Sequence, residues 1–413
     1  MYPQPDVTQD RCPGVLRLHT AADGHVARIR LPGGRLDATG LRAVSTVATR
    51  GNGVVELTSR ASLQVRGLRN EDATWAADQL WGAGLFPSFE HDRVRNILAS
   101  PFGGRHPGAA LRTDDLVTQL DRDLCGDHEL SQLPGRFLFL VEDGRRTLGL
   151  QRADVALVAC EGKATLRLDL AGCPTTLEAA PADAPSLALE AAHAFLDLLR
   201  ADGGDGWRID DLRDGAGRVA RALGGGLDGE AVPVTADGRV IPGELEQSDG
   251  RRAVTALVPL GRLGRTTLVA LSAMLDDGVG ELRLSPMRTL TIVDVPADRA
   301  QGVTQGLEVL GLIVGQDSGW DGISACAGLG ACVNARLDVR AAAASRVPAR
   351  KKAMIPVVAE HWAACERGCG RPASAVLVSA TADGLRVERG GVQTGVATVE
   401  HALALLASEA PSA

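Results

Sequence analysis

The sequence predicts an α+β fold that contains an internal duplication with pseudo-two-fold symmetry. Residues 27–86 align with residues 254–313 at a constant offset of 227, and both copies show the same order of strand and helix patterns. A group of closely spaced cysteines near the C-terminal end, outside both copies, predicts a metal centre.

The duplication is clearest where residues 30–45 lie over residues 257–272. Identical pairs in this stretch include Pro32 and Pro259, Gly34 and Gly261, Arg35 and Arg262, Leu36 and Leu263, Thr39 and Thr266, and Leu41 and Leu268. A chain rich in Ala, Gly and Leu can match itself by chance. A match over 60 residues without an insertion favours a true repeat.

Each copy has the pattern of a split β-α-β unit that closes with a helix. In the first copy we expect a helix that begins at Asp37 or Thr39, the two candidate N-caps, and a last helix that ends on Gly84. The expected strands and helices cover residues 25–31, 41–48, 54–57, 62–67 and 71–84. Such a unit is about half of a ferredoxin-like layer, so two copies predict one pseudo-symmetric domain with a site between them.

A longer α/β segment follows each half repeat. The predicted domains are residues 12–90, 91–240, 247–318 and 319–413. In the second domain we expect a strand at 136–141, a helix at 186–200 and surface loops at 175–185 and 223–229. In the last domain we expect a strand at 374–379 and a helix at 399–408.

Composition narrows the class of protein. The chain has 413 residues, 45% of them hydrophobic, and a net charge of −7, which gives no support to nucleic-acid binding. It contains no apolar run of 18 residues and no signal-peptide pattern, so we expect a cytoplasmic protein without a membrane span. Its eight cysteines are then expected to be thiols or metal ligands.

Four of these cysteines are paired at short spacings. Cys326 and Cys332 are separated by five residues, and Cys365 and Cys369 by three. Thiolates suit iron–sulfur clusters or zinc, but zinc knuckles prefer shorter spacers than five residues. The glycine-rich loops favour a cluster, because small residues let backbone N–H groups approach its sulfurs. Cys12, Cys125, Cys160 and Cys173 show no such spacing, and the role of Cys12 stays open.

Arginines gather on two neighbouring strands of the first copy. Arg28 and Arg30 alternate on one strand, and Arg60, Gln64 and Arg66 alternate near the next, so each set shares a face. A solvated strand face can look the same. The second copy replaces Arg28, Arg30 and Arg60 by Thr255, Leu257 and Met287, which favours a one-sided site for an anionic ligand, because a structural need would persist in both copies.

The cysteine spacing and four sequence segments resemble those of the siroheme sulfite and nitrite reductases. The resemblance extends over residues 12–400. The segments are RIRLPGGRL (28–36), LTSRASLQVRGL (57–68), VRNILASPFGG (94–104) and LPGRFLFLVEDG (133–144). The resemblance implies duplicated ferredoxin-like half-domains, each followed by a nitrite/sulfite reductase-type α/β domain. It also implies a 4Fe–4S cluster on Cys326, Cys332, Cys365 and Cys369. The substrate-binding residues that it implies are Arg28, Arg30, Arg60, Gln64, Arg95, Asn96 and Arg136.

The chain departs from the reductases at three positions. Arg136 and Leu138 stand where the reductases carry two lysines, and Ala61 stands where they usually have Gln. These departures resemble the precorrin-3B synthase branch of aerobic cobalamin biosynthesis. That likeness implies a monooxygenase that hydroxylates precorrin-3A with dioxygen and closes a γ-lactone. It also implies a mononuclear non-haem iron and NADH as the indirect electron source. The apolar Leu138 is expected to leave room for a ring.

No Gly-x-Gly-x-x-Gly motif follows a predicted strand, so a separate reductase or ferredoxin is expected to deliver the electrons. The iron ligands are not fixed; the candidates are His91, His106, His128 and His361. No catalytic residue is assigned. Two other functions remain open: a siroheme-dependent nitrite or sulfite reductase, and an iron–sulfur electron carrier or sensor.

Overall fold

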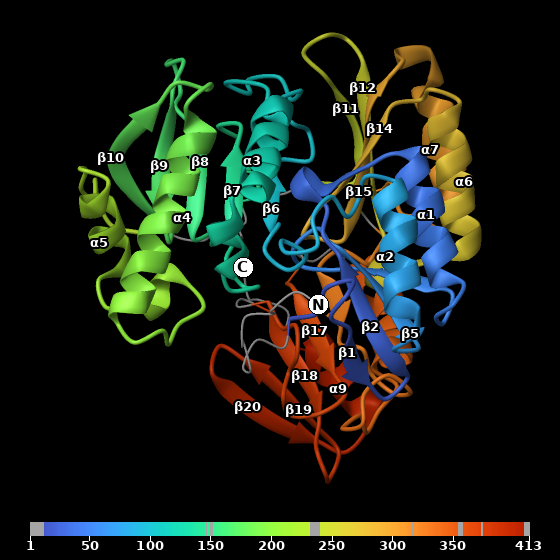
Figure 1. Cartoon of the computed structure of the whole chain (residues 1–413). Helices are drawn as coiled ribbons and strands as arrows, with labels where there is room; N and C mark the ends of the chain where they lie inside the picture. Colours follow the sequence, from blue (N-terminus) through green and yellow to red (C-terminus); the bar gives the residue numbers. More distant parts are fainter. Residues whose placement is uncertain are drawn as a thin grey trace.

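The computed structural model describes residues 12–145, 147–148, 152–231, 240–315, 318–353, 358–372 and 375–408. Within these ranges the chain forms four five-stranded sheets, two antiparallel and two mixed, with helices packed against them (Figure 1). The α+β fold class predicted from the sequence is confirmed. The first two sheets belong to the duplicated segments and the other two to the α/β segments that follow.

The first half repeat forms an antiparallel sheet of order β1-β2-β5-β4-β13. Its strands are β1 (His19–Ala21), β2 (Gly24–Ile29), β4 (Val54–Leu57), β5 (Leu63–Leu68) and β13 (Arg262–Gly264); its helices are α1 (Ala38–Ala48) and α2 (Asp72–Gly82), with the short η1 (Pro32–Gly34). Of the two candidate N-caps, Asp37 caps α1, since its carboxylate accepts a hydrogen bond from the Gly40 N–H at 2.7 Å.

The second half repeat has the same plan, in the order β11-β12-β15-β14-β3. Its strands are β11 (Gly243–Glu246), β12 (Arg252–Leu257), β14 (Glu281–Leu284), β15 (Thr289–Val295) and β3 (Arg35–Leu36); its helices are α6 (Arg265–Asp276) and α7 (Ala300–Val309), with η4 (Pro259–Gly261) and η5 (Ala297–Arg299). Each half lends an edge strand to the other, because β3 pairs with β14 and β13 pairs with β4. This exchange joins the halves into one domain with a shared core, in which α1 packs against α6 (Figure 1).

The third sheet follows the first half repeat and has the order β10-β9-β8-β7-β6. Its strands are β6 (Ile97–Ala99), β7 (Phe139–Glu142), β8 (Val155–Ala159), β9 (Leu166–Leu170) and β10 (Cys173–Ala179); its helices are α3 (Asp114–Gly126), α4 (Ala184–Ala201) and α5 (Gly215–Ala222), with η2 (His128–Gln132) and η3 (Ile209–Asp211). The surface loop predicted at 175–185 is wrong over its first part, since Thr175, Thr176 and Leu177 lie in β10.

The fourth sheet carries the C-terminal segment, at the bottom of Figure 1, in the order β16-β17-β18-β19-β20. Its strands are β16 (Ile323–Ala325), β17 (Glu360–Ala363), β18 (Val376–Ala380), β19 (Leu385–Arg389) and β20 (Val392–Val396), with the helices α8 (Val339–Ala353) and α9 (Val399–Ser408). In both the third and the fourth sheet, three neighbouring strands run parallel and the remaining pairs are antiparallel. Residue 374, where the predicted strand began, lies outside the described residues.

Candidate functional site

The cysteines are brought together by the first two strands of the fourth sheet. β16 and β17 are parallel neighbours, with Ala325 paired to Trp362. Cys326 directly follows β16, and Cys365 follows β17 after one residue. Because the carboxyl ends of parallel strands lie at the same edge of a sheet, both cysteines start their loops from that edge.

Two observations show that the four thiols share one neighbourhood. The backbone N–H of Ala364 donates a hydrogen bond to the Cys326 sulfur at 3.2 Å. The pKa of the Cys369 thiol is raised, first by burial and then by the charges of Cys365, Cys326 and Cys332. An N–H group aimed at a sulfur is one of the contacts by which proteins hold and tune iron–sulfur clusters.

The spacing of the thiols can be compared with the needs of zinc and of a cluster. Among the described residues, no group of three or more His, Cys, Asp or Glu side chains is placed to hold a metal ion. Four thiolates around one zinc would stand about 3.8 Å apart, given Zn–S bonds near 2.3 Å.

A buried histidine supports the second cysteine loop. Both ring nitrogens of His361 are engaged, Nδ1 with the Ser324 hydroxyl at 2.8 Å and Nε2 with the Cys369 carbonyl at 3.0 Å. Burial lowers the pKa of His361 to about 4, so the ring is neutral and donates from Nε2 to the carbonyl. His361 therefore positions the Cys369 loop and is not an open metal ligand.

The other histidines proposed for a mononuclear iron are also committed elsewhere. His91 contacts the Ser88 hydroxyl at 2.7 Å through Nδ1 and the Asp127 carbonyl at 2.9 Å through Nε2. Nδ1 of His106 contacts the carbonyl of Pro107, and Nδ1 of His128 contacts Glu90. The described residues therefore do not fit a mononuclear iron, and we derive no step through one.

A cavity of about 180 Å³ lies between the first half-domain and the first cysteine loop. We call it the arginine cavity. Its lining includes Arg28, Gln64, Arg66, Glu56, Leu260, Arg288, Arg340 and Cys326. Four guanidinium groups and one carboxylate thus surround a space that has one of the four cysteines on its wall, which suits a ligand with several carboxylates.

Only some of the predicted substrate residues line this cavity. Arg28 and Gln64 line it, with the Gln64 side-chain oxygen oriented to accept hydrogen bonds from Arg28 Nη2 at 2.5 Å and Nε at 3.2 Å. Arg66 also lines it and is held by a bidentate ion pair with Asp23 and a 3.0 Å bond to the Ala331 carbonyl. Arg66 thereby links the first half-domain to the loop between Cys326 and Cys332.

Arg30 and Arg60 are held by backbone carbonyls and by Asn96. Arg30 donates to the Asn96 side-chain oxygen at 2.9 Å and to two carbonyls, while its Nη2 is buried without a hydrogen-bond partner. Arg60 donates to the carbonyls of Gly135 and Arg136 at 3.2 and 2.9 Å. Burial lowers the pKa of Arg30 to about 9 and that of Arg60 to about 10. Charge interactions place Cys12 and Arg28 near both groups.

Three further residues singled out in the sequence lie outside the arginine cavity. Arg95 is buried in a bidentate ion pair with Asp121, at 2.8 and 2.7 Å, and is not among the residues of the arginine cavity. Arg136 is exposed, with its guanidinium carbon 5.0 Å from the Trp207 ring centre. Leu138 is 3% exposed and packs in the core shared by the half-domains, so it does not open room for a ring.

Arg288 lines the arginine cavity but was not predicted from the sequence. Its backbone is left-handed (φ 58°), and its stem lies so close to Gly261 that an added Cβ there would stand 2.6 Å from Arg288 Cδ. Its position in the repeat matches Ala61, which is also left-handed (φ 50°), next to Arg60. A search of both copies of this turn for arginines would have found it. The second copy therefore contributes to the cavity too, and the site is less one-sided than the loss of Arg28, Arg30 and Arg60 suggested.

The cavity is small compared with a tetrapyrrole. Ligand pockets for drug-sized molecules usually measure ~300–1,000 Å³, so in the described conformation the arginine cavity accommodates a part of such a ligand, such as a ring edge with its carboxylates. Within the described part of the chain, no helix is long and apolar enough to cross a membrane.

Comparisons with known proteins agree with this geometry. A profile of the nitrite/sulfite reductase ferredoxin-like half domain matches residues 19–80 and 245–310. The chain is 27% identical over 381 residues to a ferredoxin–nitrite reductase of Synechococcus elongatus, covering 84% of this chain and 74% of the relative. It is 24% identical over 373 residues to a precorrin-3B synthase of Sinorhizobium sp, covering 87% of this chain and 78% of the relative.

Among solved structures, the NirA protein of Mycobacterium tuberculosis shares the fold, with a TM-score of 0.73 over 93% of this chain and 78% of that one, at 19% identity. The two profile matches coincide with the two halves that exchange β3 and β13. The chain therefore contains two segments that match the nitrite/sulfite reductase ferredoxin-like half domain, and its fold is similar to that of NirA.

Proposed function

We propose that this chain is a precorrin-3B synthase, which hydroxylates precorrin-3A with dioxygen and closes a γ-lactone. The observation that carries the proposal lies at Arg136 and Leu138. Where the resembling reductases place two lysines, this chain turns one side chain onto Trp207 and buries the other in the core. Reduction of nitrite or sulfite consumes protons at a bound anion, and neither Arg136 nor Leu138 replaces a lysine as their donor.

The cluster part of the proposal rests on the four cysteines. Cys326, Cys332, Cys365 and Cys369 would hold a 4Fe–4S cluster at the edge of the fourth sheet, with the Ala364 N–H on one sulfur and His361 behind the second loop. Such a cluster supplies one electron at a time. Because Cys326 also lines the arginine cavity, the electrons would be delivered beside the substrate.

The substrate part rests on the charges of the arginine cavity. Precorrin-3A carries many carboxylates, and guanidinium groups bind carboxylates in a bidentate manner without losing their own charge. Arg28, Arg288 and Arg340 are the residues we assign to this contact. Arg30, with its buried and unpartnered Nη2, and Arg60 form a second group of cations behind Arg28.

The electrons would come from a separate protein. We expect a reductase or a ferredoxin that draws on NADH, and the relative from Synechococcus elongatus is named for ferredoxin. One oxygen atom of dioxygen enters the product and the other leaves as water, which requires two electrons and two protons. The cytoplasm, where cobalamin precursors and reduced carriers occur together, is the compartment we propose.

The test is an incubation of the purified chain with precorrin-3A, an electron source and dioxygen labelled with the heavy oxygen isotope. The expected product is heavier by one labelled oxygen atom and carries a lactone. A product that takes no label from dioxygen, or the absence of any conversion by a chain with an intact cluster, would contradict the proposal.

The second candidate is a siroheme-dependent nitrite or sulfite reductase. The match to ferredoxin–nitrite reductase favours it, and the free Nη2 of Arg30 could contact a small anion. It predicts tightly bound siroheme and reduction of nitrite or sulfite with reduced methyl viologen. A simple iron–sulfur carrier or sensor is disfavoured, because it has no use for a cavity lined by four arginines.

A further inference from the structure

The loop between α4 and η3, residues 202–208, places an aromatic ring beside Arg136. The Arg136 guanidinium carbon lies 5.0 Å from the centre of the Trp207 ring, which is partly exposed. Among the described residues, the Arg136 side chain has neither a hydrogen bond nor an ion pair. A cation on an exposed indole ring is held weakly, so Arg136 is available to a stronger partner such as a carboxylate.

Two carboxylates fix the backbone of this loop. Asp211 accepts hydrogen bonds from the backbone N–H groups of Trp207 at 2.8 Å and Arg208 at 3.0 Å. Asp154, which is 1% exposed, forms an ion pair with Arg208 Nε at 2.7 Å and accepts a hydrogen bond from the Leu138 N–H at 2.9 Å. The Trp207 backbone is therefore tied to the segment that leads into β7, so its ring occupies a defined place.

Arg60 connects this loop with the arginine cavity. Its Nη2 donates a hydrogen bond to the Arg136 carbonyl at 2.9 Å. Burial first, and then the charge of Arg208, lowers the pKa of Arg60 to about 10, and the charge of Arg28 also contributes. Arg28 lines the arginine cavity. Trp207 and Arg136 therefore continue the same group of cations beyond Arg60, on the side of the third sheet.

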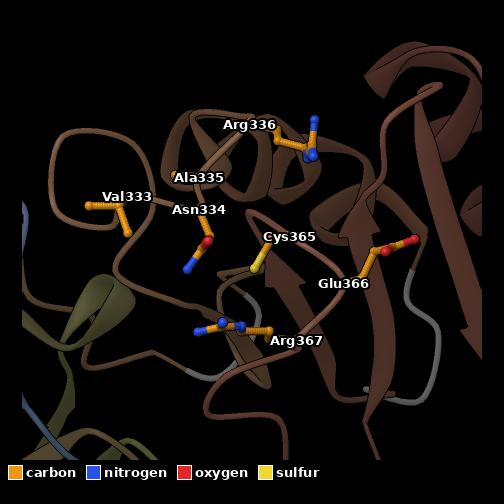
Figure 2. Close-up of a pocket in the computed structure, with 7 residues that line it drawn as sticks. All are labelled: Val333, Asn334, Ala335, Arg336, Cys365, Glu366 and Arg367. Carbon is orange, nitrogen blue, oxygen red and sulfur yellow. The ribbon is translucent and has the colours of Figure 1, made fainter.

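The remainder of a tetrapyrrole must lie outside the arginine cavity, which measures about 180 Å³. Figure 2 shows a second cavity, of about 430 Å³, lined by residues 333–336 and 365–367. This cavity has no lining residue in common with the arginine cavity, so the two do not form one continuous site. The Trp207 loop is joined to Arg28 through Arg60, and it offers an aromatic face and a cation to a ring with carboxylates on its edge.

We propose that Trp207 and Arg136 bind the part of the tetrapyrrole substrate that projects from the arginine cavity. Trp207 would contact the face of one pyrrole ring, and Arg136 would leave Trp207 and pair with a carboxylate. The inference deepens the proposed function and rests on its substrate part. Nitrite and sulfite have no ring for Trp207 to contact, so Trp207 would be a specificity-determining residue for a large cyclic substrate.

The experiment titrates the full-length protein, under anaerobic conditions, into uroporphyrin III, a fluorescent tetrapyrrole with eight carboxylates, and measures the affinity from fluorescence anisotropy. Trp207→Ala should weaken binding about three- to tenfold, whereas Trp207→Phe keeps an aromatic face and should weaken it less than about twofold. Arg136→Ala should weaken it about three- to tenfold. The matched controls are Trp81→Ala, at an exposed tryptophan of α2, and Arg251→Ala, in the turn between β11 and β12; both should bind as the parent does.

Porphobilinogen, a single pyrrole with two carboxylates, tests the arginine cavity alone. Its affinity, measured by calorimetry, should be the same in Trp207→Ala as in the parent. A Trp207→Ala protein that binds uroporphyrin III as tightly as the parent, or that weakens both probes equally, would overturn the inference, because Trp207 would then contact no ring or would only shape the arginine cavity. Neither titration uses dioxygen or a reductant, so the result is independent of whether the chain hydroxylates precorrin-3A.

Discussion

The third and fourth sheets have the same strand order and directions, yet they differ in the loops that leave their first two strands. The pairing of Ala99 with Val141 corresponds to that of Ala325 with Trp362. By this register Ser100 occupies the place of Cys326, and Gly144 the place of Cys365. Ser100 is fully buried, and its hydroxyl has no hydrogen-bond partner among the described residues.

The loop after β6 holds domains together. Arg105, in this loop, is 3% exposed and forms ion pairs of 2.7 Å with Asp294 and 2.8 Å with Asp114. Asp114 in turn pairs with the buried Arg283 of β14 at 2.8 Å. In the fourth sheet the equivalent loop instead presents thiols to a shared centre. The same sheet arrangement thus connects domains through its loop in the third sheet and carries a candidate redox site in the fourth.

The largest effect is expected at the cysteines. Cys326→Ser should remove nearly all bound iron and sulfide, because the four ligands act together and metal binding is coupled to folding of the loops. Iron and sulfide analysis of the purified protein measures this. Ser100→Ala, at the equivalent place, is the matched control; it should keep the iron and should not lower the free energy of unfolding, because the hydroxyl it removes is buried without a partner. A Cys326→Ser protein with full iron content would contradict the comparison.

The ion pairs that Asp114 forms with Arg105 and Arg283 are tested by Asp114→Asn. Loss of this carboxylate leaves the buried Arg283 and Arg105 short of one partner each, and breaking a buried ion pair costs about 3–5 kcal/mol. Unfolding by urea measures the loss, while the iron content should stay unchanged. Asp123→Asn, on the same helix at a more exposed place, should cost less than ~1 kcal/mol. Equal effects of the two variants would show that the ion pairs of Asp114 do not stabilise the folded protein.

Arg288→Ala tests the arginine cavity. A charge-assisted contact is worth ~1.5–3 kcal/mol, so binding of precorrin-3A should weaken by roughly ten- to a hundredfold, with the cluster kept. Equilibrium titration of the anaerobic protein measures the affinity. Arg251→Ala should bind as the parent does. If Arg288→Ala also binds as tightly as the parent, the cavity is not the carboxylate site.

The smallest effect concerns pH. Burial raises the pKa of Asp114, but Arg283 and Arg105 outweigh burial and hold it below its ordinary 3.8. The native state thus binds this proton less readily than the unfolded state does. Its stabilisation is complete above pH 3.8 and is lost as the pH falls through the lowered native value. The difference in free energy of unfolding between the parent and Asp114→Asn should shrink below pH 3.8, as measured by urea titrations over this range. A constant difference would contradict the assignment.

Local patterns predicted much of this molecule. The offset of 227 placed both half repeats correctly, because strand alternation, the Pro-Gly turns and the Asp37 cap are local features. The exchange of β3 and β13 was not predictable from such patterns, since it depends on how the halves meet. For the same reason neither the ion pair of Arg95 with Asp121 nor the place of Arg288 at the cavity could be predicted from local patterns.

The central claim is that the chain holds an iron–sulfur cluster and takes its tetrapyrrole as a substrate, not as a resident cofactor. It is tested most directly by the absorption spectrum of anaerobically purified protein, with iron, sulfide and extractable tetrapyrrole measured on the same sample. The account predicts about four iron and four sulfide per chain and a broad shoulder without a Soret band. Siroheme bound at about one per chain, with its strong Soret and red bands, would contradict it.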